Sequence, residues 1–162
     1  MPRTRDTDPS AEEHEAREPR HSGAVRPRPP SRARLEAAVC EAVLRYQLHQ
    51  PLLDPPQPPC YYVALRGRDP QTTLLRRLRA LTPRVQPLSQ CRVTAREGVL
   101  DRTTGARGVI VQVARLAWVH AAAVDVVGGY YITHRHAASF RYHVEHDGRQ
   151  WAVTAAHLLW RV

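Results

Sequence analysis

The sequence predicts an α+β protein in which an N-terminal helix packs on a curved antiparallel sheet, with one additional short helix. Apolar residues recur at helical spacing between residues 32 and 49, and a shorter apolar stripe follows between residues 70 and 81. From about residue 98 the chain alternates apolar and polar residues, as strands with one covered face do. A length of 162 residues suits one domain with a hydrophobic core.

The first 30 residues differ in composition from the rest of the chain. They mix six arginines and six acidic residues with Pro, Ser and Gly, and Val25 is their one large aliphatic residue beyond Met1. Burial of so few apolar side chains does not offset the entropy lost on ordering. We therefore expect residues 1–30 to form a disordered N-terminal tail and residues 31–162 to form a single α+β domain.

The first helix is expected over residues 32–49. Ser31 can cap its start, Glu41 and Arg45 are spaced as a favourable i, i+4 ion pair, and Pro51 prevents its continuation. Five prolines between Pro51 and Pro59 then predict a stiff connector, because proline removes the backbone donor that helices and sheets need.

A strand over residues 61–66 and the second helix follow the connector. Asp69 is expected to cap that helix, and Pro70 suits its first position. Further strands are expected at about residues 98–102, 109–120, 123–133, 138–146 and 149–160.

The last hairpin has a predicted register. A two-residue turn at Asp147-Gly148 is favoured and would pair Val144 with Trp151. The polar residues of the strand before the turn would then share one solvent-facing side. A change in the parity of apolar residues beyond Ala155 predicts a β-bulge in the last strand.

Five stretches carry a resemblance to known proteins. They are "YYVALRGRDPQTTLLRRLRAL", "LSQC", "TGARGVIVQV", "GGYY" and "YHVEHDGRQWAVTAAHLLW", in this order. Over roughly residues 35–162 the chain resembles a group of small uncharacterised bacterial proteins, and its shape looks like the cystatin-like or nuclear-transport-factor-like cone. The resemblance implies a helix cradled by a curved sheet and passes on no catalytic residue. That fold hosts enzymes, ligand binders and dimerisation modules alike.

The charge of the chain bears on nucleic-acid binding. All 24 basic residues are arginine, and neither Lys nor Asn occurs. Because both missing residues have A-rich codons, their absence indicates a GC-rich coding sequence rather than a selected surface. The excess of nine positive charges lies on residues 31–162, where a basic face attracts phosphate polymers. No recognised nucleic-acid-binding motif accompanies the charge, so nucleic-acid binding is kept as an alternative.

Cysteine spacing and hydropathy argue against several other classes of protein. Cys40, Cys60 and Cys91 contain no C-x-x-C pair, which argues against a disulfide framework or a cysteine zinc site. The start of the sequence lacks the apolar core of a secretory signal, and no apolar run approaches the roughly 18 residues of a membrane span. We expect a soluble, cytoplasmic protein without a cofactor.

Four histidines between residues 134 and 146 raise the question of a metal site. His134 and His136 are expected in a hairpin loop and His143 on a polar strand face, whereas His146 adjoins a turn roughly 20 Å away. A zinc or copper ion needs three or four ligands about 2 Å from one point. His134, His136 and His143 are therefore metal candidates only, and solvated histidines are the preferred interpretation.

His120 and Asp125 form the acid/base candidate. They flank "AAAV", where one strand is expected to turn into the next, and a carboxylate that orients an imidazole recurs in catalysis. Tyr46 or Tyr130 would be a neighbour if the cone has an open mouth. Because a His and an Asp at a sheet edge usually face water, no catalytic residue is assigned.

The expected function follows from what the sequence lacks. It contains no nucleophile motif, phosphate-binding loop, dinucleotide fingerprint or paired acidic motif. We therefore expect a non-catalytic domain that binds a small ligand or a protein partner. The alternatives are a cone-type enzyme that applies acid/base chemistry to a small molecule, and nucleic-acid binding through the Arg-rich surface.

Overall fold

The computed structural model describes residues 30–50, 60–82 and 84–162. The expected connector at residues 51–59 and almost all of the expected tail lie outside these described residues. The elements are α1 (Arg32–His49), β1 (Tyr61–Leu65), α2 (Thr72–Arg79), β2 (Val85–Pro87), the short 3-10 helix η1 (Leu88–Gln90), β3 (Cys91–Thr94), β4 (Gly98–Asp101), β5 (Val109–His120), β6 (Ala123–Thr133), β7 (His136–His146) and β8 (Trp151–Arg161).

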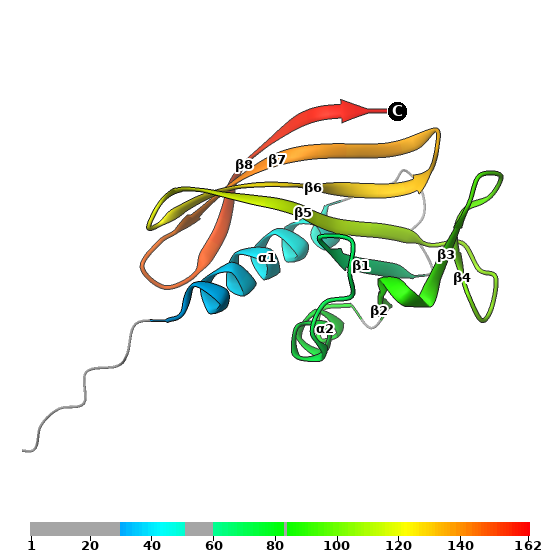
Figure 1. Ribbon diagram of the computed structural model, residues 1–162, viewed down its shortest axis with the longest axis horizontal. Coiled ribbons are helices and arrows are strands. Elements are labelled where there is room, and N and C mark those ends of the chain that lie inside the picture. Colours follow the sequence, from blue (N-terminus) through cyan, green and yellow to red (C-terminus); the bar gives the residue numbers. More distant parts are fainter. Residues whose placement is uncertain (1–29, 51–59, 83) are drawn as a thin grey trace, which may run out of the picture.

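The main sheet has six strands in the order β2-β1-β5-β6-β7-β8, and β3 and β4 form a separate hairpin. Figure 1 shows α1 lying across the curved sheet and α2 lying near β1 and β2. The long strands β5 to β8 pair antiparallel in chain order. The predicted α+β class, with an N-terminal helix on a mostly antiparallel sheet and one short additional helix, is confirmed.

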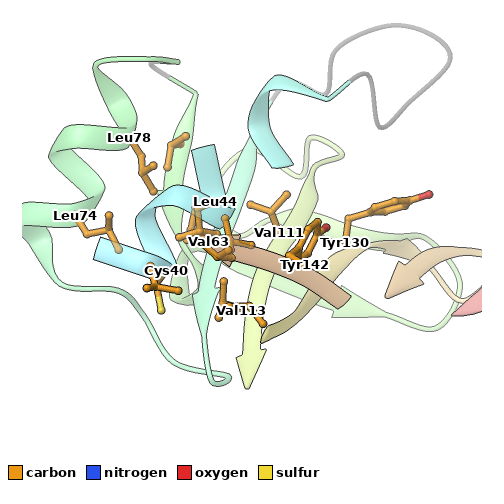
Figure 2. Packing of buried hydrophobic residues seen from close by; sticks show 14 of the residues in the cluster. Cys40, Leu44, Val63, Leu74, Leu78, Val111, Val113, Tyr130 and Tyr142 are labelled. Atoms are coloured by element: carbon orange, nitrogen blue, oxygen red, sulfur yellow. The ribbon is translucent and has the colours of Figure 1, made fainter. Parts of the chain in front are cut away.

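Helix α1 begins and ends where the sequence predicts. The Ser31 hydroxyl accepts a hydrogen bond from the Arg34 N–H at 3.4 Å, and Arg45 donates to Glu41 at 2.8 Å. Val39, Val43 and Leu44 of α1 are fully buried against the sheet, and Figure 2 shows Leu44 among strand valines of this core. Each such aliphatic side chain contributes roughly 1.5–3 kcal/mol by burial, so the helix is fixed mainly by packing.

Strand β1 pairs in parallel with both neighbours, β2 and β5, a feature that the sequence analysis did not anticipate. Parallel neighbours need a crossover, and α2 supplies it between β1 and β2. The apolar stripe of α2 is buried and consists of Leu74, Leu75 and Leu78. The centre of β1 is also buried, as expected for a strand covered on both faces.

Helix α2 starts later than predicted. It begins at Thr72 rather than at residue 70, and no side chain caps its first turn. The Asp69 carboxylate instead accepts a hydrogen bond from the Ser89 N–H at 2.8 Å. The predicted cap is therefore wrong, because Asp69 ties the loop before α2 to the distant helix η1.

The turn between β7 and β8 is longer than predicted. Val144 pairs with Val153, so the predicted partner Trp151 is wrong. The Asp147 carboxylate accepts two backbone N–H groups from the same turn, both at 2.8 Å, which stabilises four residues where two were expected. The predicted bulge is confirmed, since the register of β8 shifts past Thr154.

A buried amide lies at the contact between α1 and the sheet. Gln47, the one buried polar side chain among the described residues, donates from Nε2 to the Gln112 carbonyl at 3.1 Å and to the Tyr142 hydroxyl at 3.3 Å. Gly128 lies directly beneath, where an added Cβ would come within 2.4 Å of the Gln112 oxygen and 3.0 Å of Gln47 Nε2. Gly128 therefore allows α1 to approach the sheet.

Replacement of Gly128 by Ala should test this close approach. We expect Gly128→Ala to lower the free energy of unfolding, measured by urea denaturation, by about 3 kcal/mol, because the new methyl group collides with backbone. Gly67→Ala is the control, since its φ of +73° is strained for alanine but nothing lies within 4 Å of the new Cβ. That control should lose about 1 kcal/mol. Equal losses would show that the contact beneath Gln47 is not tight.

Candidate functional site

A groove of about 680 Å³ lies between the N-terminal half of α1 and the β7–β8 hairpin. Its lining combines basic side chains with a smaller apolar surface. The lining residues are Pro30, Arg34, Leu35, Ala38, Glu41, Ala42, Arg45, His146, Arg149, Gln150 and Trp151. A hollow of this size falls within the range of small-ligand sites, roughly 300–1,000 Å³.

The charge of the groove is positive. Arg34, Arg45 and Arg149 line it, and Glu41 is the one carboxylate in the lining. Glu41 is already bound by Arg45 at 2.8 Å and by Arg77 of α2 at 2.7 Å. Burial alone would raise the pKa of Glu41, but hydrogen bonds from Arg77 and Arg45 outweigh it and hold that pKa below its ordinary value. The carboxylate therefore stays ionised and shared between two arginines.

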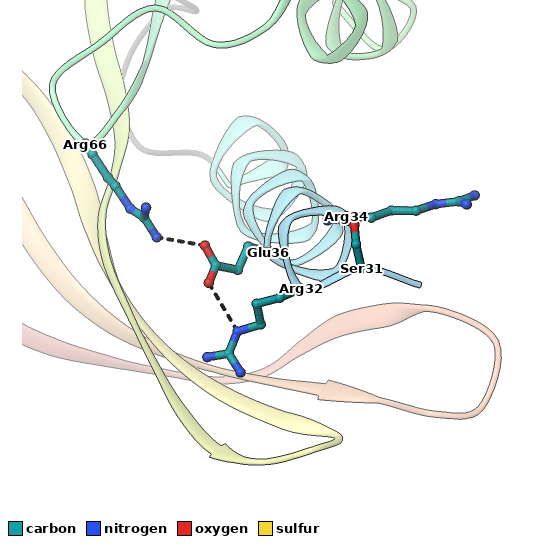
Figure 3. A network of polar contacts seen from close by, with 5 residues as sticks. All are labelled: Ser31, Arg32, Arg34, Glu36 and Arg66. Atoms are coloured by element: carbon teal, nitrogen blue, oxygen red, sulfur yellow. Dashed lines mark hydrogen bonds and ion pairs between the residues drawn. The ribbon is translucent and has the colours of Figure 1, made fainter. Parts of the chain in front are cut away.

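Arg34 is placed differently from its neighbours on α1. Glu36 accepts hydrogen bonds from Arg32 at 3.2 Å and from Arg66 at 3.0 Å. Figure 3 shows this network, with the Arg34 side chain directed away from it. Arg34 is thus free of the carboxylate that engages the other arginines around the start of the helix.

Aromatic contacts hold the apolar side of the groove. The Trp151 ring makes edge contacts with the rings of Trp118 and His146, with centroids 5.6 Å and 5.1 Å apart. The Arg32 guanidinium lies 4.2 Å from the centroid of the Trp118 ring, within cation–π range. These contacts fix Trp151 as a flat surface beside the arginines.

The groove arginines of α1 were not predicted as a site, yet their spacing carried a signal. Arg34, Ala38, Glu41 and Arg45 are separated by four, three and four residues, so they share one side of the helix. This second stripe was not predicted as a site because the other wall comes from the β7–β8 turn. The turn residues reach the helix only through the tertiary fold.

The acid/base candidates make no hydrogen bond to each other in the described part of the chain. His120 lies at the β5–β6 turn, where its Nδ1 accepts a hydrogen bond from the Ala122 N–H at 3.2 Å. Asp125 instead lies opposite His143 on β7, and their side chains are 2.7 Å apart. The predicted partner of Asp125 was therefore not found, and the observed partner is a residue that had been considered only as a metal ligand.

The pair of Asp125 and His143 lies on the face of the sheet opposite α1. The hydrogen bond to Asp125 raises the pKa of His143, burial opposes the change, and Glu145 at 3.5 Å adds to it. About one third of each side chain in the pair is exposed, and neither residue lines the groove. The pair can hold an oriented, readily protonated imidazole on this face of the sheet.

The metal candidates do not converge. His134 is exposed in the β6–β7 turn, and His136 packs its ring against Tyr130 with centroids 5.8 Å apart. Within residues 30–50, 60–82 and 84–162, no group of three His, Cys, Asp or Glu side chains is placed to hold a metal ion. Cys40, Cys60 and Cys91 are free thiols, and burial raises the pKa of Cys40 to about 11, which disfavours a reactive thiolate.

A second polar contact supports the edge of the smaller hairpin. The Tyr62 hydroxyl donates to the Asp101 carboxylate at 2.7 Å, and the N–H groups of Thr103 and Thr104 also donate to it. The hydrogen bond from Tyr62, with those two backbone donors, lowers the pKa of Asp101 to about 2. Asp101 is thus a structural anchor between β1 and β4 rather than an acid/base group.

Comparisons with protein-family models, curated proteins and solved structures found no match for the chain. The resemblance to small bacterial proteins with a cystatin-like or nuclear-transport-factor-like cone therefore stays a prediction. The described helices include none that is long and apolar enough to cross a membrane.

Removal of the carboxylate beside His143 should lower the pKa of that histidine. Because the wild-type pKa is raised, the pair stabilises the folded state fully below about pH 6.5 and loses this effect as pH rises through the folded value. In Asp125→Asn, NMR titration should show a lower His143 pKa. Glu145→Gln, which removes a more distant carboxylate, should give a smaller decrease. A larger effect from Glu145→Gln would contradict the assigned geometry.

Loss of the Tyr62 hydroxyl should change the acid response of the fold. A carboxyl group with a lowered pKa stabilises the folded state above its unfolded pKa, near 3.9, and this contribution disappears as pH falls through about 2. We expect Tyr62→Phe to raise the Asp101 pKa toward its ordinary value. The difference in melting temperature from wild type should be present at pH 6 and shrink between pH 4 and pH 2. Tyr131 lies on the same face of the sheet as Tyr62 but is not among the hydrogen-bond donors to Asp101, so Tyr131→Phe should leave the Asp101 pKa unchanged.

Proposed function

We propose that the protein is a non-catalytic binding domain that takes up a small organic anion in the groove between α1 and the β7–β8 hairpin. One observation carries the proposal: the groove's single carboxylate, Glu41, is paired with Arg45 and Arg77, so the other two lining arginines, Arg34 and Arg149, face no carboxylate in the lining. A ligand with a carboxylate or phosphate group therefore meets unsatisfied positive charge rather than an internal anion.

The lining residues match the two parts of such a ligand. The guanidinium fork presents paired donors that fit the oxygens of a carboxylate or phosphate, and its charge persists at any physiological pH. Trp151, Leu35 and Ala38 offer an apolar surface next to these donors. An anion with an aromatic or aliphatic body therefore suits the groove better than an inorganic ion does.

The same proposal places the protein in the cytoplasm and relates it to the cystatin-like or nuclear-transport-factor-like cone. A helix packed across a curved sheet supports the relationship, and the three free cysteines support a reducing compartment. A fold of this kind can host binding or catalysis, so the proposal depends on the groove itself.

An acid/base enzyme is the second candidate, favoured by the hydrogen bond between Asp125 and His143. The location of this pair argues against an enzyme, because neither side chain lines the groove. Catalysis in the groove would instead need His146, whose Nδ1 accepts a hydrogen bond from the Gly148 N–H at 3.1 Å. That contact serves the turn, so we assign His146 to binding.

A panel of anions tests the proposal. Benzoate, phenyl phosphate, citrate and inorganic phosphate would be titrated into the full chain by calorimetry at about 50 mM salt. We expect at least one organic anion to bind more tightly than inorganic phosphate. Arg149→Ala should weaken that affinity about tenfold or more, because a hydrogen bond to a charged group is worth roughly 1.5–3 kcal/mol.

Arg141→Ala is the matched control. Arg141 is an exposed arginine of β7 that does not line the groove, so its loss changes the net charge equally. Equal effects of the two substitutions would indicate general electrostatic attraction, and absence of binding by every anion would reject the proposal. Tight binding of an oligonucleotide with steep salt dependence, and no binding of small anions, would favour the nucleic-acid alternative.

A further inference from the structure

Strand β8 is a long, open edge of the main sheet. Its eleven residues span about 35 Å and pair on one side with β7, while the other side has no neighbour in the described sheet. Such an edge presents unpaired N–H and C=O groups that can template another strand. Large apolar side chains at its C-terminal end are exposed, namely Leu158 at 56%, Leu159 at 43%, Trp160 at 53% and Val162 at 58%.

The opposite edge of the sheet is closed to such pairing. Strand β2 has three residues and ends in Pro87, which has no N–H to donate. The Arg79 guanidinium donates hydrogen bonds to the Val85 carbonyl at 2.8 Å and to the Gln86 side chain. Short length, proline and a covering arginine are the usual protections of an edge strand. Strand β8 contains no proline and no acidic residue, and Arg161 is its last residue.

The pairing with β7 shows on which face of the main sheet each β8 side chain lies. Tyr142 and Val144 belong to the core beneath α1, and their partners are Ala156 and Val153. The α1 side of β8 therefore holds Trp151, Val153, Ala156, Leu158 and Arg161, and the outer side holds Ala152, Ala155, His157 and Trp160. Thr154 and Leu159 lie at the two register shifts.

The sequence of β8 is complementary to itself when two copies run antiparallel. A two-fold axis through Ala156 places Ala155 opposite His157 and Ala152 opposite Trp160 of the second copy, and each of these pairs shares one face. Small side chains thus meet large ones along the strand. An axis through Ala155 would instead oppose Val153 and His157, which lie on different faces.

Charge also suits a second copy. In the register centred on Ala156, Arg161 of each chain lies opposite Trp151 of the other, where cation–π contact is favourable. No two arginines of β8 are brought together. This is notable for a chain of net charge +9, because most of its surface would repel a second copy.

We propose that the protein forms a symmetric dimer in which the β8 strands of two copies pair antiparallel about Ala156, joining two six-stranded sheets into one continuous sheet. The occupant of the edge is a second copy, and the pairing buries the exposed residues at the end of each strand. Trp151 also lines the anion groove, so the two proposals share this residue, but the strand pairing requires no bound anion.

Charge reversal at the axis tests the proposal. Sedimentation velocity of the full chain should show a wild-type dimer at micromolar concentration. Ala156→Lys and Ala156→Glu each place two like charges across the axis, so each variant alone should dimerise at least tenfold more weakly. An equimolar mixture of the two should restore the dimer, because opposite charges then face each other. Restoration also shows that both variants fold.

Val119→Lys and Val119→Glu are the matched controls, since Val119 is 56% exposed on β5, away from the β8 edge. These controls should dimerise as wild type does. A monomeric wild-type protein at about 100 µM would overturn the proposal, even if the edge bound a strand from another protein. A dimer that persists equally in Ala156→Lys would overturn it as well.

Discussion

The Gln47 amide sets how deeply α1 lies on the sheet, and much of the structure depends on that depth. Its two hydrogen bonds reach the β5 backbone and the Tyr142 hydroxyl on β7, so one side chain links the helix to two strands. Its Oε1 is buried without a hydrogen-bond partner among the described residues, so the two bonds from Nε2 are what offset the cost of burying the amide and make its position specific. The register of β5, β6 and β7 must therefore bring Gln112, Gly128 and Tyr142 beneath one residue of α1.

The groove follows from the same placement. Arg34 and Arg45 are carried by the rigid helix, whereas Arg149 and Trp151 come from the β7–β8 hairpin. Glu41 has a strong influence on the charge of the groove. With a single arginine partner, its negative charge would lower the positive potential of the groove more than it does when two arginines share it. The second partner, Arg77, comes from α2, so the packing of the small helix bears on the electrostatics of a site that it does not line.

The sequence was sufficient where structure depends on neighbouring residues. The cap at Ser31 and the ion pair of Glu41 and Arg45 are local, so α1 could be predicted to the residue. The polar alternation of β7 was also readable, but the partner of Asp125 was not. That partner depends on the tight β6–β7 turn, in which Thr133 pairs with His136, and on the register shift beside it, beyond which Tyr131 pairs with Ala137 and Asp125 with His143. A longer loop had been expected there.

Interactions between distant segments were the ones that sequence reasoning missed. Nothing near Tyr61 indicates that β1 enters the sheet parallel to β5, since its partner Val109 follows α2, the short strand β2, η1 and the β3–β4 hairpin. The same limit applies to the groove, whose two walls are far apart in sequence. The resemblance to the cystatin-like or nuclear-transport-factor-like cone remains a prediction.

The insertion of β1 beside β5 also has a kinetic consequence. The three hairpin contacts from β5 to β8 join segments adjacent in the chain, so they close short loops and are entropically inexpensive to form early. The pairing of β1 with β5 must close a much longer loop, and it also completes the core against α1 and α2. We therefore expect the antiparallel meander to form first in folding, and the pairing of β1 with β5 to follow.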